Sequence, residues 1–167
     1  MVRVTLNYAE YYTHFSFLLF IISFALPFTS SIKYFILVNS IIVGIAGNLV
    51  YMKDYQTFVE GYQQYYPKMT MEEINRELVM SNFLCHTVPL VISLFLLFQC
   101  TPFVSTFRDA IRYSLYEFIV FFTWTMVPYQ DQIVTEKVSN AYPSTSYAVF
   151  MTSFITILVY TVIYFVQ

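Results

Sequence analysis

Two ionisable side chains interrupt long apolar runs of this 167-residue sequence, and both are candidates for chemistry. His86 lies in "SNFLCHTVPLV" (81–91), and Glu117 lies in "RYSLYEFIVFF" (112–122). Imidazole is a common general base, and it works best when its pKa is near the working pH. Because an ionisable group in an apolar helix is costly, each of the two is a functional hypothesis. Of the two, His86 is the candidate catalytic residue.

Amide and indole side chains are expected at the depth of His86. A rise of about 1.5 Å per residue puts His86 about 6–8 Å from the end of its run. Asn48 lies close to the same side in the preceding run, and Trp124 lies past the middle of the following run. The spacing predicts a pocket bounded by Asn48, His86 and Trp124, with Asn39, about three turns from Asn48, as a further binding residue.

A structural interpretation of the same residues stays open. Asn48 and His86 would then be hydrogen-bonding links between helices, each contributing about 1 kcal/mol or less. Glu117 follows Arg112 closely and can extend toward the membrane interface. Because its run enters from the opposite side, we expect no direct pair between Glu117 and His86.

Pro89 and two glycines indicate how the helices around His86 are built. Proline has no N–H to donate to the carbonyl of Cys85, so we expect an acceptor beside His86 and a bend in the helix. Gly44 and Gly47, in "GIAGN", predict a close approach between helices.

The composition points to a lipid environment. The chain is 58% hydrophobic and 11% charged, whereas soluble domains carry about 25% charged residues. The net charge of −2 gives no basic surface, so we expect no nucleic-acid partner. The two cysteines are too far apart along one helix to bridge, and no His/Cys cluster has metal-ligand spacing. We therefore expect no metal and no other cofactor.

Five apolar runs are each near the about 20 residues of a membrane-spanning helix. They cover 13–29, 33–52, 82–100, 113–129 and 144–166. Lipid offers the backbone no hydrogen-bond partners, so the runs should be helices. The sequence predicts an all-α fold, a polytopic membrane helix bundle of about five transmembrane helices in one domain over 1–167. The first run also resembles a signal peptide, but Glu10 and the lack of a small-residue cleavage site count against that.

The long connection 53–81 is polar and is expected to be a loop with one short amphipathic helix. Thr70 and Glu73 fit a capping box at the start of that helix. After them, apolar residues recur at helical spacing on one side. They are Met71, Ile74, Leu78 and Val79.

Two stretches resemble spans of the androgen-induced and androgen-dependent integral membrane protein family and its bacterial relatives, "KYFILVNSIIV" (33–43) and "NFLCHTVPLVISLFLLF" (82–98). Two more, "WTMVPY" (124–129) and "AYPSTSY" (141–147), lie where the relatives carry Trp and then Tyr-Pro before a last span. The resemblance implies an intramembrane hydrolase of fatty-acid esters of hydroxy fatty acids, with a threonine nucleophile and a histidine. His86 takes the family's histidine position. The threonine position falls on Ile36, which leaves Ser40 as the alternative hydroxyl, and the family usually has six spans.

Three functions remain open at this stage. The first is a lipid-binding or lipid-hydrolysing membrane protein centred on His86. The second is a non-catalytic structural or assembly protein in which His86 and Asn48 only fix helix packing. The third is a small channel or carrier, against which the few charged groups in the spans count. We expect membrane lipids as partners, and a second copy or another membrane protein as a further partner.

Overall fold

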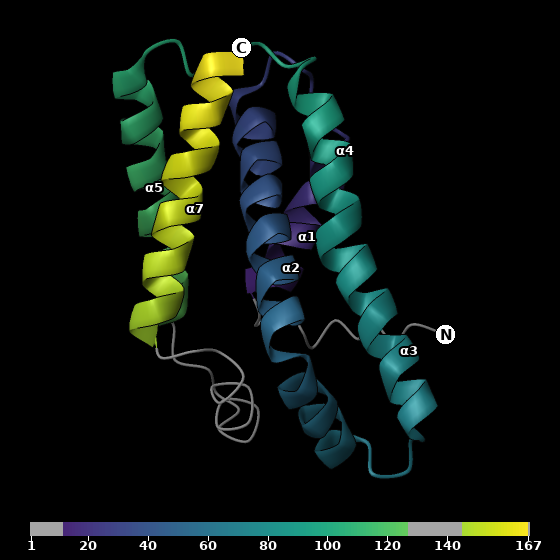
Figure 1. The fold of residues 1–167 in the computed structure, drawn as a ribbon. Coiled ribbons are helices and arrows are strands. Elements are labelled where there is room, and N and C mark those ends of the chain that lie inside the picture. Colours follow the sequence, from purple (N-terminus) through teal and green to yellow (C-terminus); the bar gives the residue numbers. More distant parts are fainter. Residues whose placement is uncertain (1–11, 127–144, 167) are drawn as a thin grey trace.

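A computed structural model describes residues 12–126 and 145–166, and every regular element in these ranges is a helix. The all-α prediction is therefore confirmed for the described part of the chain. In order, the elements are α1 (Tyr12–Ser23), α2 (Ser31–Tyr65), α3 (Met71–Asn82), the π-helical segment η2 (Phe83–Thr87), α4 (Val88–Leu97), α5 (Phe107–Met126) and α7 (Thr145–Val166). Figure 1 shows α3, η2 and α4 as one continuous run of helix.

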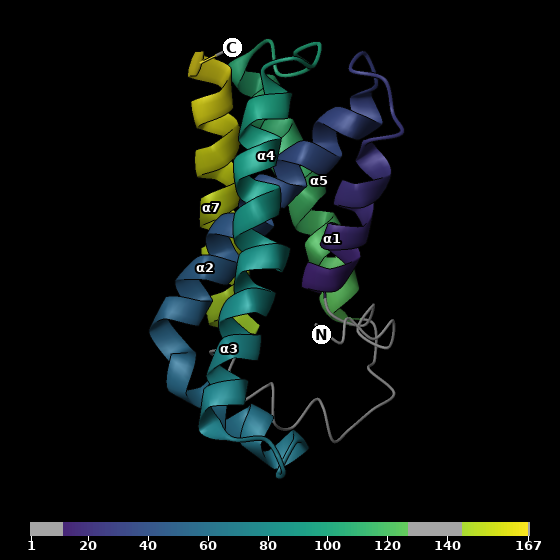
Figure 2. The same cartoon turned by 90° about the vertical axis from the view of Figure 1, so that its right-hand side faces the viewer.

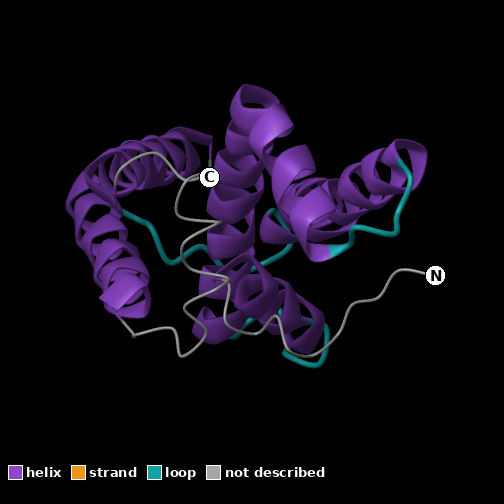
Figure 3. Ribbon diagram, turned by 90° about the horizontal axis from the view of Figure 1, so that it is seen from below, coloured by secondary structure: helices purple, strands orange, loops and turns teal. Residues whose placement is uncertain are grey.

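Helix α2 is the centre of the arrangement. It packs against α1, α4, α7, α3 and η2, while α5 packs on α7 (Figures 1 and 2). Figure 3, seen from below, shows the helices as separate rods rather than as stacked layers. The main core lies around the first half of α2, where Tyr34, Leu37 and Val38 are completely buried. This core fixes the positions of α1, α4 and α7 relative to α2.

The turn between α1 and α2 is held by a buried lysine. Lys33 is only 3% exposed, and its Nζ donates to the carbonyl of Leu26 at 2.9 Å. The same ammonium lies 3.8 Å from the centre of the Phe28 ring, a cation–π contact. The amide of Thr101 donates to the Phe28 carbonyl at 3.1 Å, which joins this turn to the α4–α5 connection. These contacts hold the turn that sets the orientation of α1 relative to α2.

Among the described residues, two helical stretches are long and apolar enough to cross a membrane, Ser31–Lys53 and Met71–Leu97. Ser153–Val166 is a shorter apolar helix. The described α1 has 12 residues, about 18 Å, against a hydrocarbon layer of about 30 Å. It ends at Ser23 rather than at residue 29, because Pro27 lacks an N–H and disfavours helical geometry in the residue before it. The predicted first span is thus longer than the described helix.

The prediction for 53–81 is right for its second half, where α3 is the short amphipathic helix, and wrong for residues 53–65, which are helical rather than a loop. Helix α2 continues for 35 residues as far as Tyr65, and α3 begins at Met71. The capping box at the start of α3 is confirmed, since the Thr70 amide donates to Glu73 Oε2 at 2.8 Å and the Glu73 amide donates to Thr70 Oγ1 at 3.3 Å. Residues 53–65 therefore extend α2, because helix α3 packs back against them.

The predicted apolar face of α3 is half right. Ile74 and Leu78 are buried against Val59 of α2 in a small second core. Met71 and Val79 are instead exposed, at 46% and 53%. Residues four apart share a helix face, and α2 covers only the strip that contains Ile74 and Leu78.

Helix α5 begins with a side-chain cap that fixes its first turn. Thr106 Oγ1 accepts from the Asp109 amide at 3.1 Å, and Asp109 Oδ2 accepts from the Thr106 amide at 3.1 Å and from the Thr106 hydroxyl at 2.8 Å. The hydroxyl of Ser105 also donates to the same carboxylate oxygen at 3.0 Å. Hydrogen bonds from Thr106, and then from Ser105, hold the pKa of Asp109 below its ordinary range.

Removing this cap is expected to loosen the start of α5. Replacing an N-cap threonine with alanine costs about 1 kcal/mol, so Thr106→Ala should speed amide exchange in the first turn of α5 about fivefold. The control Thr106→Ser keeps the hydroxyl and should exchange like the wild type. Hydrogen–deuterium exchange read by mass spectrometry is the measurement, and equal rates in all three proteins would contradict the cap.

Because of this cap, the stability of the first turn of α5 should decrease at low pH. Because the pKa of Asp109 is lower in the folded state, the ionised carboxylate contributes stability that is present above the ordinary Asp pKa of about 4 and is lost as pH falls through the folded value. The ratio of the amide exchange rate of the wild type to that of Asp109→Asn, measured in the first turn of α5, should therefore rise only below about pH 4. If amide exchange in the two proteins changed with pH in the same way, the proposed role of the Asp109 carboxylate would be contradicted.

Candidate functional site

His86 lies in a single wide turn within an otherwise α-helical run. In η2 (Phe83–Thr87) the backbone opens to π-helical geometry, and the Val88 amide donates to the Phe83 carbonyl five residues back. The cause is Pro89, whose ring would collide with the carbonyl four residues back in a regular α-helix. The predicted irregularity is thus present, but as a wider turn. The run from α3 to α4 continues without a sharp kink (Figure 1).

A hydrogen-bonded group of polar side chains joins this turn to α2. Asn48 Oδ1 accepts from Asn82 Nδ2 at 2.9 Å and from Thr87 Oγ1 at 3.2 Å, and Asn48 Nδ2 donates to the Gly44 carbonyl at 2.8 Å. His86 Nδ1 lies 3.0 Å from Asn82 Oδ1. An amide oxygen only accepts, so His86 Nδ1 carries the proton in this arrangement. The four side chains form what we call the Asn48 network.

The imidazole ring of His86 lies directly against the backbone of Gly47. A Cβ atom at Gly47 would overlap the ring. At Gly44, a Cβ would lie 2.7 Å from Leu90 Cβ and 2.8 Å from the His86 carbonyl oxygen. The predicted close approach at these glycines is confirmed. The residues that come close to them are His86 of η2 and Leu90 of α4.

The structure brings two of the predicted site residues together. Asn48 and His86 share one network, as their equal depth predicted, but the link runs through Asn82 rather than directly. The sequence contains a signal for Asn82, because it precedes His86 by four residues and so lies on the same helix face. Trp124 belongs to α5, and its side chain lies outside the described part of the structure.

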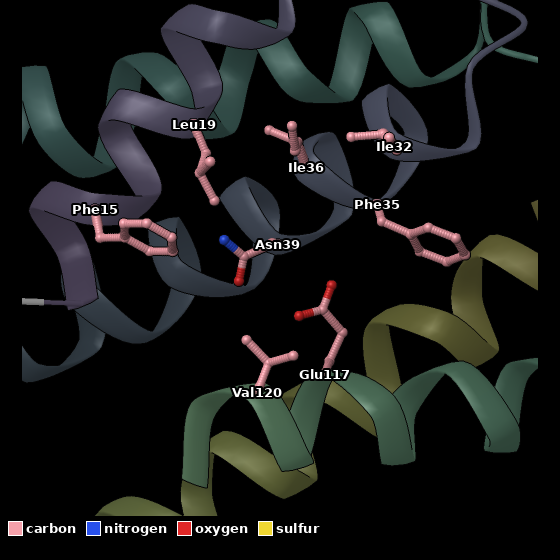
Figure 4. A pocket seen from close by; sticks show the side chains of 8 residues that line it. All are labelled: Phe15, Leu19, Ile32, Phe35, Ile36, Asn39, Glu117 and Val120. Atoms are coloured by element: carbon pink, nitrogen blue, oxygen red, sulfur yellow. The ribbon is translucent and has the colours of Figure 1, made fainter. Parts of the chain in front are cut away.

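Asn39 and Glu117 meet at a second place, a pocket between α1, α2 and α5 (Figure 4). The pocket has a volume of about 250 Å³. Six of the eight described lining residues are apolar; the eight are Phe15, Leu19, Ile32, Phe35, Ile36, Asn39, Glu117 and Val120. Ile32 and Val120 are 63% and 51% exposed, so the pocket opens to the surface between α1 and α5. We call it the α1–α2–α5 pocket.

Glu117 turns into this pocket instead of extending toward the end of its helix. It is half-buried, and Glu117 Oε1 accepts from the Tyr160 hydroxyl of α7 at 3.4 Å. Helix α5 begins at Phe107, ten residues before Glu117, which places the carboxyl about 15 Å along the helix. Glu117 therefore points into the bundle, toward Tyr160 and the pocket, and not along α5 toward Arg112. As expected, Glu117 and His86 lie in different clusters.

The neighbours of Asn39 and Ile36 define the rest of the pocket chemistry. Asn39 Nδ2 donates to the buried Ser16 hydroxyl at 2.8 Å, which links α2 to α1. Ile36 lines the pocket at the position where the resembled family has threonine. The Ser40 hydroxyl donates to the Ile36 carbonyl at 2.8 Å.

The two sites can do different things. The Asn48 network connects two helices through side-chain hydrogen bonds, and the α1–α2–α5 pocket offers an apolar wall with two polar residues. Comparisons of the chain with models of known protein families, with curated proteins and with solved structures find no match. The functional assignment therefore rests on the geometry of these two sites.

Proposed function

We propose that this chain is a polytopic integral membrane protein that binds a single-chain lipid in the α1–α2–α5 pocket. In this proposal His86 does not act on the lipid. It holds the α3–α4 run against α2 through the Asn48 network. The observation that carries the proposal is an open, mostly apolar pocket between helices whose outer surfaces are themselves apolar.

The outward-facing apolar surface supports a membrane location. Only 22% of the most apolar part of Met71–Leu97 is buried, so this stretch differs from the core helix of a soluble protein. Phe95 and Phe165, on α4 and α7, are 71% and 76% exposed. Soluble monomers rarely expose apolar patches of this kind over several helices. In the proposal, α2, α3–α4, α5 and α7 cross the bilayer, and α1 packs beside α2.

The dimensions of the pocket support one chain rather than a whole two-chain lipid. Pockets for drug-sized ligands are about 300–1,000 Å³, and this one has about 250 Å³. Aromatic and branched side chains from three helices line it. An apolar chain that leaves the bilayer for this pocket keeps an apolar surrounding and gains close packing.

The same geometry favours binding over hydrolysis. A hydroxyl nucleophile needs a base within hydrogen-bond reach, and the described lining of the pocket includes neither a hydroxyl nor an imidazole. Ser40, the alternative to the missing threonine, donates to a carbonyl of its own helix, and Thr87 donates to Asn48. The resemblance to the hydrolase family thus supports a similar helix arrangement more than the same chemistry.

Filling the pocket is expected to prevent lipid binding. Leu19 lines the pocket, whereas its neighbour Leu18 is 39% exposed and lies outside the lining. Leu19→Trp should reduce labelling by a photoreactive single-chain lipid in nanodiscs about tenfold, equivalent to about 1.4 kcal/mol, while Leu18→Trp should leave it unchanged. Cross-linked peptides identified by mass spectrometry should come from α1, α2 and α5. Equal labelling of the two variants, or labelling spread over all helices, would overturn the proposal.

A further inference from the structure

We propose that the α1–α2–α5 pocket selects a long-chain amine, whose protonated amino group pairs with Glu117. This inference rests on the proposed function, since it names the head group of the lipid that the pocket binds. It is carried by the charge and the hydrogen-bonding character of the pocket lining.

In the described lining of the pocket, Glu117 is the one acidic group, and there is no basic one. No Lys, Arg or His is among the residues that line the pocket in the described part of the structure. The nearby Arg112 is exposed on α5, where its Nε donates to the Tyr116 hydroxyl at 2.9 Å. A carboxylate in an apolar surrounding is costly unless a cation or several donors accompany it. A ligand with a positive charge supplies that partner.

The polar end of the pocket presents the carboxyl group of Glu117 to a ligand. Tyr160 donates to one oxygen of Glu117, Oε1, over a long 3.4 Å. The amide nitrogen of Asn39 is directed to Ser16, and Figure 4 shows the Asn39 amide and the Glu117 carboxyl pointing into the pocket from facing sides. A head group that donates hydrogen bonds fits between them. A free fatty acid would instead place a second carboxylate beside Glu117.

The depth of the two residues sets where the head group lies. Asn39 is eight residues and Glu117 ten residues from the start of its helix, so both lie about 12–15 Å from the same end of the bundle. In a hydrocarbon layer of about 30 Å, this is close to the middle. An ammonium group at that depth needs a partner charge as much as the carboxylate does, so each stabilises the other.

The test compares amphiphiles that differ only in the head group. The full chain in phosphatidylcholine nanodiscs is labelled with a photoreactive long-chain amine, and dodecylamine, dodecanol, dodecanoate and N-dodecylacetamide compete at equal mole fraction. Dodecylamine should compete at least about tenfold better than the neutral and anionic compounds, because hydrogen bonds to charged groups are the strong ones. N-dodecylacetamide has a nearly identical chain without the charge, so it tests the inference in the wild-type protein.

Substitution of Glu117 provides the second arm. Glu117→Gln keeps the shape and should reduce the advantage of dodecylamine over dodecanol to within about twofold. The control Glu72→Gln, at an exposed position on α3, should retain the full advantage. If dodecanol and dodecylamine compete equally and Glu117→Gln changes nothing, the amine inference is overturned while lipid binding stands. If none of the four dodecyl compounds competes and Leu19→Trp has no effect, the proposed function fails as well.

Discussion

Gly47→Ala should destabilise the protein by about 1–3 kcal/mol, the usual cost of overpacking a close contact. The added methyl group would occupy the space of the His86 ring. In an unhindered helix the same substitution stabilises by up to about 1 kcal/mol, because alanine is the better helix former. A loss of stability therefore isolates the steric contact. Thermal unfolding in detergent, followed by circular dichroism, measures the change.

A second substitution should reverse the effect of the first. In a His86→Ala background the ring is gone, so Gly47→Ala should become neutral or stabilising. Gly44→Ala is the matched control, because its added methyl group would meet Leu90 Cβ at 2.7 Å and the His86 backbone carbonyl at 2.8 Å. These atoms remain in His86→Ala, so Gly44→Ala should stay destabilising. If His86→Ala rescued both glycine substitutions or neither of them, His86 would not be the packing partner of Gly47.

The parts of the fold that periodicity and spacing could predict are local. The apolar runs identified where helices occur, the Thr70–Glu73 pair identified the start of α3, and Pro89 identified an irregularity beside His86. Counting helix rise placed Asn48 and His86 at one depth, and they share one network. These features depend on a few neighbouring residues or on one pair of helices.

The features that the sequence did not reveal depend on which helices are neighbours. The α1–α2–α5 pocket combines residues from three helices, two of which are far apart in the chain, and no spacing rule relates Asn39 to Glu117. Depth alone left Glu117 free to point to the interface or to the interior. The extension of α2 to Tyr65 has the same origin. Its polar composition indicated a loop, but packing of Ile74 and Leu78 on Val59 stabilises a helix there.

The π turn explains how a proline fits between two packed helix segments. The α3 segment packs on the second half of α2, around Val59, and α4 packs on the first half of α2. A regular α-helix with Pro89 would bend and separate one of the two contacts. The wide turn instead absorbs one extra residue, so both flanking segments keep their faces toward α2. His86 lies in this turn and contacts Gly47, so the turn and the close approach occur at the same level.

Single-residue deletions in this run should therefore have opposite outcomes. Deleting Leu84 together with Pro89→Ala removes the extra residue and its cause, and should leave a folded protein with α3 and α4 in their original orientations. Deleting Val91 removes an exposed side chain from α4, yet it rotates everything after it by about 100°, one residue of a helix with 3.6 residues per turn. Leu97, which is buried in the main core, would turn outward, and losing one such leucine costs about 2–5 kcal/mol. We expect little or no folded protein from this deletion.

Val91→Ala separates the rotation from the loss of the side chain, and it should fold nearly as well as the wild type, because Val91 is 45% exposed. Yield of monodisperse protein by size-exclusion chromatography and the midpoint of thermal unfolding are the readouts. If both deletions are equally damaging, the wide turn is itself required, and η2 then holds His86 in a geometry that a regular helix does not provide. If both are tolerated, α4 does not depend on its register against α2, and the packing of Leu97 in the main core would carry little of the stability.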